Sequence, residues 1–103
     1  MESLLNASTN ISLSNAVPQF RQRVEKLTEK EEFSDLAGQM FGHVTGLVRM
    51  AADNDNADAS ANSYARACEI LRAVRDEARE LEWPETYNEL LRKFKHEIGR
   101  AHV

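Results

Sequence analysis

Residues 64–98 read YARACEILRAVRDEARELEWPETYNELLRKFKHEI, and this stretch predicts two helices and the connection between them. Apolar side chains in its first half recur at steps of three and four, which places them on one helical face. They are Tyr64, Ala67, Cys68, Leu71, Val74, Ala78 and Leu81. Pro84 disfavours helix at Trp83 but is tolerated in a first turn, so a second helix is expected to begin there. An antiparallel helical hairpin follows.

The second helix of this hairpin has its own apolar stripe, and Gly99 stands where a left-handed C-terminal cap is usually found. The stripe consists of Tyr87, Leu90, Leu91, Phe94 and Ile98. Upstream, Pro18 suits the first turn of a short amphipathic helix that ends near Leu27. Thr28 and Glu31 fit a capping box, which predicts the start of the longest helix. Its apolar positions are Phe33, Leu36, Ala37, Met40, Phe41, Val44, Leu47, Val48 and Ala51.

These patterns predict an all-α fold, a compact array of about four helices with antiparallel hairpins. With 103 residues the chain forms one domain at most. Residues 1–16 are rich in Ser and Asn and are expected to be a flexible linker or tail, and residues 17–103 a helical interaction domain. Ser60 or Ser63 is expected to cap the third helix after a polar loop. Cys68, the single cysteine, is expected in the core.

Composition and motifs exclude several classes of protein. A net charge of −4 is typical of proteins that do not bind nucleic acid over their whole surface. No secretory signal or membrane-spanning run is present. The loop from Asp53 to Asp58 begins like a calcium loop but lacks the turn glycine and the final glutamate. We predict no catalytic residues, no metal site and no cofactor.

Three glycines at four-residue steps form the most unusual feature of the longest helix. Gly38, Gly42 and Gly46 fall on the face opposite the apolar stripe, and Arg49 follows them there. Each glycine costs about 1 kcal/mol of helix stability relative to alanine. A smooth strip lets another backbone approach closely, so the strip is a candidate helix-packing or dimer interface. Tolerated flexibility is the equally weighted alternative.

Two groups of basic residues are candidate binding sites. The first could bind a partner, although local ion pairs with Glu69, Asp76 and Glu80 favour a self-neutralised face. It consists of Arg72, Arg75 and Arg79. The second could contact DNA phosphates, although cations also suit the negative end of a helix. It consists of Arg92, Lys93, Lys95 and Arg100.

The run from Ile70 to Ala78, ILRAVRDEA, resembles the C-terminal helical domain of the large subunit of Ku, the heterodimer that binds DNA double-strand ends. The family's basic, alanine-containing and acidic run is in register here. The matching residues are Arg72, Ala73, Arg75, Asp76, Glu77 and Ala78. Tyr87, Asn88, Leu91 and Ile98 fall where the family has aromatic, amide and aliphatic residues. With the upstream helices, the resemblance spans about 80 residues.

This resemblance implies a tethered, non-catalytic recruitment module in non-homologous end joining, located in the nucleus. It implies the Ku small subunit and DNA ends as partners through the rest of the parent protein, and the DNA-dependent protein kinase or other repair factors. Only Arg100, Ala101, His102 and Val103 follow Gly99 here, so we expect the family's acidic, hydrophobic kinase-binding tail to be absent. We therefore expect a homodimer that covers apolar surface and helps to bridge DNA ends. The alternatives are an accessory, sequence-independent DNA-binding module and an unrelated small helical adaptor.

Overall fold

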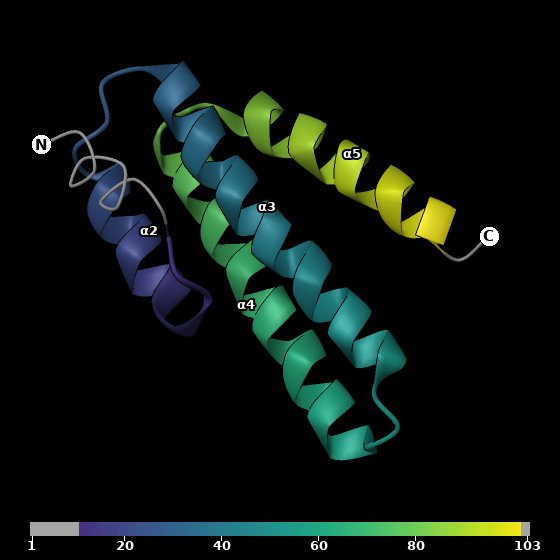
Figure 1. The fold of residues 1–103 in the computed structure, drawn as a ribbon. Helices are drawn as coiled ribbons and strands as arrows, with labels where there is room; N and C mark the ends of the chain where they lie inside the picture. The colour runs from purple at the N-terminus through teal and green to yellow at the C-terminus, as the bar shows by residue number, and fades with distance from the viewer. Residues whose placement is uncertain (1–10, 102–103) are drawn as a thin grey trace, which may run out of the picture.

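The computed structural model describes residues 11–101, with side chains described as far as Glu97. A short 3₁₀ helix, η1 (Leu13–Asn15), precedes four α-helices. These are α2 (Ala16–Val24), α3 (Lys30–Asp53), α4 (Ala57–Glu80) and α5 (Pro84–Ala101). The long helices α3 and α4 lie antiparallel, α2 packs along one side of them, and α5 diverges from α3 on the other side (Figure 1). The predicted all-α array of four helices is confirmed over the described residues.

Three aromatic rings tie one end of the array together. Phe20 of α2 and Phe33 of α3 are both fully buried, and their ring centroids lie 6.0 Å apart. Phe33 also contacts Trp83, which joins α4 to α5, at 5.9 Å. Tilted aromatic pairs at this separation stabilise beyond the area they bury. One contact chain therefore fixes α2, α3 and the α4–α5 connection.

A second aromatic cluster holds α5 against α3. Phe41 of α3 is only 6% exposed, and its ring lies 5.9 Å from Tyr87 and 6.0 Å from Phe94 of α5. The apolar residues of α5 pack on the core but remain partly exposed, as predicted for a helix with one apolar stripe. Because α5 turns away from α3, this stripe is covered on one side only.

The connection between α4 and α5 forms a helix-ending motif that the sequence did not reveal. The backbone N–H of Trp83 donates to the carbonyl of Ala78 at 2.8 Å, and that of Glu82 donates to Arg79 at 3.1 Å. This pair of bonds defines a Schellman motif. Glu82 takes the left-handed position with a φ of 62°, where glycine is usual. A non-glycine side chain is strained there.

Two predicted helix caps are wrong. Helix α3 begins at Lys30 with Glu29 as N-cap and no side-chain cap bond, so Thr28 lies outside the helix. Thr28 lies instead in the connection where the chain reverses direction between α2 and α3. Helix α4 begins at Ala57, where the Asn56 side chain accepts from the N–H groups of Asp58 and Ala59. Ser60 instead donates its hydroxyl to the Ala51 carbonyl at 2.7 Å. It therefore satisfies the end of α3.

The segment before α2 belongs to the packed unit from Ile11 onward. Ile11 is 4% exposed, its N–H donates to Gln39 at 2.8 Å, and Nε2 of His43 donates to its carbonyl at 2.6 Å. Arg66 of α4 donates to the carbonyl of Leu13 at 3.0 Å. Residues 11–16, expected to belong to the linker, are thus part of the packed structure. Side chains of α3 and α4 form hydrogen bonds with the backbone of this segment. The remainder of the expected linker, residues 1–10, lies outside the described residues.

The buried face of α4 is rotated relative to the predicted one. Ala67, Ile70, Val74 and Ala78 are buried, whereas Cys68 and Tyr64 are exposed. The prediction of Cys68 as a core residue is therefore wrong, because the large aliphatic side chain of Ile70 defines the centre of the face. Helix α5 also continues through Gly99 to Ala101, so the expected cap at Gly99 is not formed.

Replacing Glu82 with glycine should stabilise the protein by about 1 kcal/mol, because glycine adopts a positive φ without the steric strain of a Cβ. Urea unfolding followed by circular dichroism measures the change. Glu69→Gly is the matched control, since the same substitution inside α4 should destabilise by about 1 kcal/mol. An equal loss of stability in both variants would contradict the assigned role of Glu82.

Replacing Phe41 with alanine should destabilise the protein by about 3 to 5 kcal/mol, because it removes a buried ring and both of its contacts with α5. The fluorescence of Trp83, the single tryptophan, and circular dichroism report unfolding independently. Met50→Ala on the same helix is the control, since Met50 is 56% exposed and should change stability by about 0.5 kcal/mol or less. Similar losses in the two variants would rule out Phe41 as the anchor of α5.

Candidate protein-interaction surfaces

An open strip of residues runs along α3 on the side facing away from the core. Its members follow one another at three- and four-residue steps and are exposed, apart from the partly exposed Gly38. They are Asp35, Gly38, Gly42, Gly46, Arg49 and Asp53. A Cβ placed on any of these three glycines would meet nothing within 4 Å. The glycines therefore serve no close contact within the described part of the chain. We call these six residues the α3 strip.

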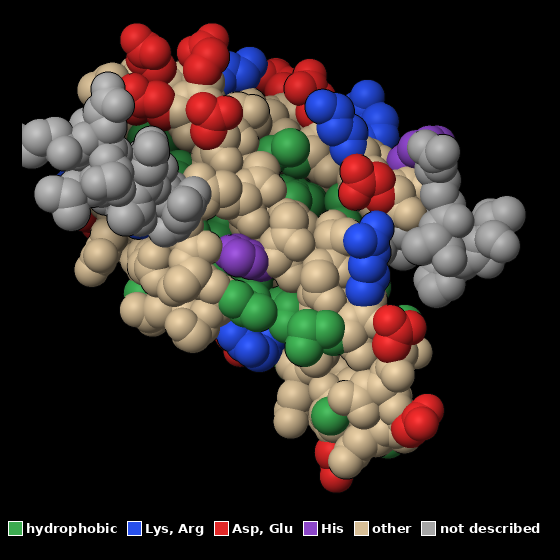
Figure 2. All heavy atoms as spheres, in the orientation of Figure 1, with side chains coloured by type: hydrophobic (Ala, Val, Ile, Leu, Met, Phe, Trp, Pro, Cys, Tyr) green, Lys and Arg blue, Asp and Glu red, His purple; other side chains and the backbone are tan. Residues whose placement is uncertain are grey.

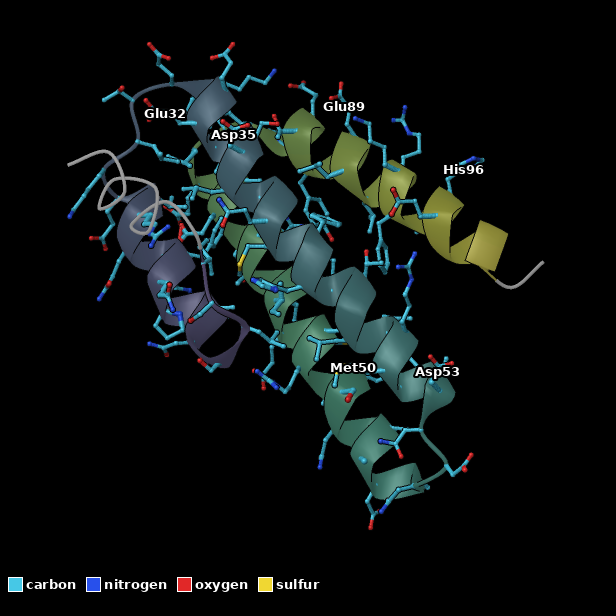
Figure 3. The ribbon with its side chains drawn as sticks, in the orientation of Figure 1. Glu32, Asp35, Met50, Asp53, Glu89 and His96 are labelled. Carbon is cyan, nitrogen blue, oxygen red and sulfur yellow. The ribbon has the colours of Figure 1, made fainter. Side chains whose placement is uncertain are left out.

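The two ends of α3 differ in charge and shape. Figure 3 shows Glu32 and Asp35 near its first turns and Met50 and Asp53 near its last. Acidic side chains gather at the first end in the space-filling view (Figure 2). At the other end Arg49, Met50 and Asp53 border an open hollow of about 610 Å³ beside the α3–α4 loop. Met50 was not singled out from the sequence, because this methionine, one turn beyond Gly46, lies beside the apolar face of the same helix.

The three arginines of α4 follow one another at three- and four-residue steps along one side of that helix. Arg75 pairs with Asp76 at 3.3 Å, and both side chains are substantially exposed. Within residues 11–97, Arg72 and Arg79 form no ion pair. The predicted self-neutralisation through Glu69 and Glu80 is therefore not observed in the described geometry. Two of the three arginines remain available to a partner.

Charged residues of α4 influence the Tyr87 hydroxyl of α5. Burial against α3 raises the pKa of the Tyr87 hydroxyl, and the positive charges of Arg75 and Arg79 act in the opposite direction. The negative charge of Asp76 acts in the same direction as burial, so charges of both signs on α4 influence the hydroxyl. On another side of α4, burial raises the pKa of Glu77, and the charge of Arg21 on α2 opposes the shift. The arginine group and the α2 contact therefore occupy different sides of α4.

The basic residues of α5 do not form one cluster. Arg92 and Lys93 border a shallow hollow of about 480 Å³ together with Glu89 and His96. Glu89 and His96 point away from α3 (Figure 3), so this hollow lies on the outward face. Lys95 lies on the edge of α5 next to Leu91 by its helical position. The side chain of Arg100 lies outside the described residues. Of the three predicted phosphate contacts whose side chains are described, Arg92 and Lys93 border the same hollow.

The described residues contain no group of three or more His, Cys, Asp or Glu side chains arranged to hold a metal ion. Within the same part of the chain, no helix combines the length and hydropathy needed to span a membrane. Burial, hydrogen bonding and charge instead distinguish helix faces that lie open at the surface. The fold and its candidate sites define a small all-α domain whose distinctive residues are presented on exposed helix faces.

Comparison with known proteins agrees with this class. The family described as Ku C terminal domain like matches residues 15–102, and the chain belongs to this family. The ATP-dependent DNA helicase II subunit 2 of Chaetomium globosum is 39% identical over 100 residues, which cover 95% of this chain and 13% of that protein. The same-named proteins of Phaeosphaeria nodorum and Neurospora crassa are each 33% identical over 88 residues, 85% of this chain and 11% of theirs. No solved structure matches the chain.

Proposed function

We propose that this chain is a non-catalytic interaction and recruitment domain of a Ku large subunit, acting in the nucleus in the repair of DNA double-strand breaks by non-homologous end joining. Family membership and the similarity to subunit 2 proteins support this proposal. The chain spans 11–13% of the length of these relatives. Contacts with DNA ends and the Ku small subunit are therefore assigned to the rest of the parent protein.

The α3 strip supports self-association as the activity of the domain. Three glycines on an exposed face cost about 1 kcal/mol each in a helix, and no described contact offsets that cost. Close approach of a second helix would offset it through packing. This open, glycine-lined face is the observation that carries the proposal.

The order of residues along the α3 strip suits a symmetric dimer of antiparallel helices. A twofold axis at Gly42 would place Gly38 opposite Gly46 of the second copy, since each lies four residues from the centre. Asp35 and Arg49 lie seven residues from Gly42 on opposite sides, so each would face its opposite charge. A twofold interface requires this reciprocity, because each surface must be complementary to itself. The glycines and the Asp35–Arg49 pair thus share one axis, whereas Asp53 would face Glu31 of the second copy.

A dimer of this kind would connect two Ku molecules bound at two DNA ends. Tethering makes the second association effectively intramolecular, so a weak contact between domains would hold the ends together. Recruitment of the DNA-dependent protein kinase or other repair factors belongs to the same proposal, with Arg72, Arg75 and Arg79 as the candidate partner-binding residues. These residues lie on α4 and are separate from the α3 strip.

Reversing either charge of the α3 strip should weaken the dimer, and reversing both should restore it. Arg49→Asp and Asp35→Arg each leave like charges opposed, whereas the double variant exchanges the two partners. Sedimentation equilibrium over a concentration series measures the dissociation constant, and each single change should raise it about tenfold or more. Arg92→Asp on α5 is the charge-matched control. Failure of the double variant to recover association would contradict the antiparallel arrangement.

Gly42→Leu tests the same surface without changing charge. It should abolish association while circular dichroism shows intact helices, because the added side chain meets only solvent within the monomer. A wild-type chain that stays monomeric at the highest concentrations would remove self-association from the proposal.

The outward face of α5 supports a second candidate function, contact with the DNA backbone. Arg92 and Lys93 are exposed side by side, and His96 lies beside them. Glu89 borders the same hollow and opposes the approach of a phosphate. The opposing carboxylate and the overall net charge of −4 make self-association the better-supported function.

If α5 binds DNA, a fluorescent blunt duplex should be bound weakly, with an affinity that falls steeply between about 50 and 200 mM salt, as is usual for phosphate contacts. Arg92→Glu with Lys93→Glu should then abolish the anisotropy change, because two cations become repulsive. Arg72→Glu with Arg79→Glu is a control of equal charge on α4. Binding that survives the α5 changes would place any DNA contact elsewhere.

A further inference from the structure

One side of α4 carries residues that contribute little to the packing of the core and take no part in the proposed dimer. Five residues recur along it at three- and four-residue steps, and we call them the α4 stripe. They are Tyr64, Cys68, Leu71, Arg75 and Arg79. Helices α4 and α5 pack against each other, and Leu71 of the stripe is partly buried against the core. Helix α5 diverges from the α3–α4 hairpin toward its C-terminus (Figure 1), and Tyr64 and Cys68 at one end of the stripe are exposed.

The uncovered end is apolar. Tyr64 is 47% exposed, Cys68 is exposed and Leu71 is partly buried against the core. Phe94 of α5 contacts Phe41 of α3, and Val48 lies two turns further along that same face of α3. Both Phe94 and Val48 are only partly buried. Partly buried or exposed apolar side chains thus remain on α3, α4 and α5.

The arginines beside this apolar surface are only partly neutralised by the neighbouring Glu69, Asp76 and Glu80, although the chain as a whole carries −4. Arg72 and Arg79 form no ion pair within residues 11–97, and Arg75 pairs only with Asp76. Glu82 is the acidic residue at the far end, beyond Arg79. Lys95 lies one helical turn from Leu91, on the edge of α5. The distribution favours a partner that has apolar side chains and negative flanks.

We propose that the α4 stripe and the adjoining edge of α5 bind an acidic amphipathic helix of a partner protein. The proposal rests on the recruitment role of the domain and specifies the chemistry of its partner. An amphipathic helix presents its apolar residues at steps of three and four, and Tyr64, Cys68 and Leu71 offer it apolar contacts along α4. Glutamates beside the apolar face of that helix would pair with Arg72 and Arg79. Complementary charge of this kind determines partner choice and orientation.

Cys68 provides a direct measurement of occupancy. It is the single cysteine of the chain, it is exposed, and it lies in the middle of the apolar end of the α4 stripe. The rate of its reaction with a disulfide reagent such as DTNB should fall when the surface is covered. The probe is a synthetic helix of about 18 residues with Leu and Phe on one face and Glu beside them, long enough for helix formation. The same peptide with Lys in place of Glu is the matched control.

The acidic peptide should slow the reaction of Cys68 about tenfold at saturation, whereas the lysine peptide should leave it unchanged. Arg72→Glu with Arg79→Glu should weaken the acidic peptide about tenfold or more. Arg92→Glu with Lys93→Glu makes an equal charge change on the outward face and should have no effect. Tyr64→Asp, at an exposed position that does not threaten the core, should also weaken binding.

Several results would overturn the proposal. Equal protection by the lysine peptide would show that charge does not select the partner, and protection by neither peptide would show that no such helix binds. Protection that rises with the concentration of the chain alone would mean that a second copy covers the stripe.

The Gly42→Leu variant separates this proposal from self-association. Protection of Cys68 by the acidic peptide in that monomeric variant supports the α4 stripe even if the α3 dimer fails. A wild-type dimer in which the acidic peptide leaves Cys68 unprotected would overturn the α4 stripe and leave self-association intact.

Discussion

The contact of Phe41 with Tyr87 and Phe94 determines which surfaces of this domain are open. One buried ring on α3 holds two rings of α5 at 5.9 and 6.0 Å, one in the first turn of α5 and one near its middle. Beyond this point α5 leaves the α3–α4 hairpin (Figure 1). The glycines of the α3 strip and the Tyr64–Cys68 end of the α4 stripe both remain open within the described chain.

The number, order and type of the helices could be predicted because apolar residues at steps of three and four fix the buried face of a long helix. The apolar face of α3 is the clearest case, since Phe33, Met40, Val44 and Leu47 are all fully or almost fully buried. On α4 the same rule was ambiguous. Ile70 and Cys68 both continue a plausible stripe, and only the position of α3 decides that Ile70 is inside and Cys68 outside.

Other features depend on contacts that no local pattern encodes. Glu82 adopts a positive φ because Trp83 must reach the carbonyl of Ala78 while its ring packs on Phe33. The backbone of Ile11 is ordered by Gln39 and His43, which lie about thirty residues away in the chain. The position of the glycines on the open face of α3 was predictable from their spacing. The exposure of Asp35 on the same face, and of Met50 next to it, could be established only from the structure.

The locations of the two proposed surfaces have a consequence for how the domain would work. Pairing through the α3 strip involves a face of α3, whereas an acidic helix would lie along α4 and the edge of α5. Neither surface includes a residue of the other, so a second copy and a partner helix would not compete for the same side chains. A dimer would present two α4 stripes, and a partner with two acidic helices would bind with an affinity raised by effective concentration. In that arrangement self-association would strengthen recruitment as well as connect DNA ends.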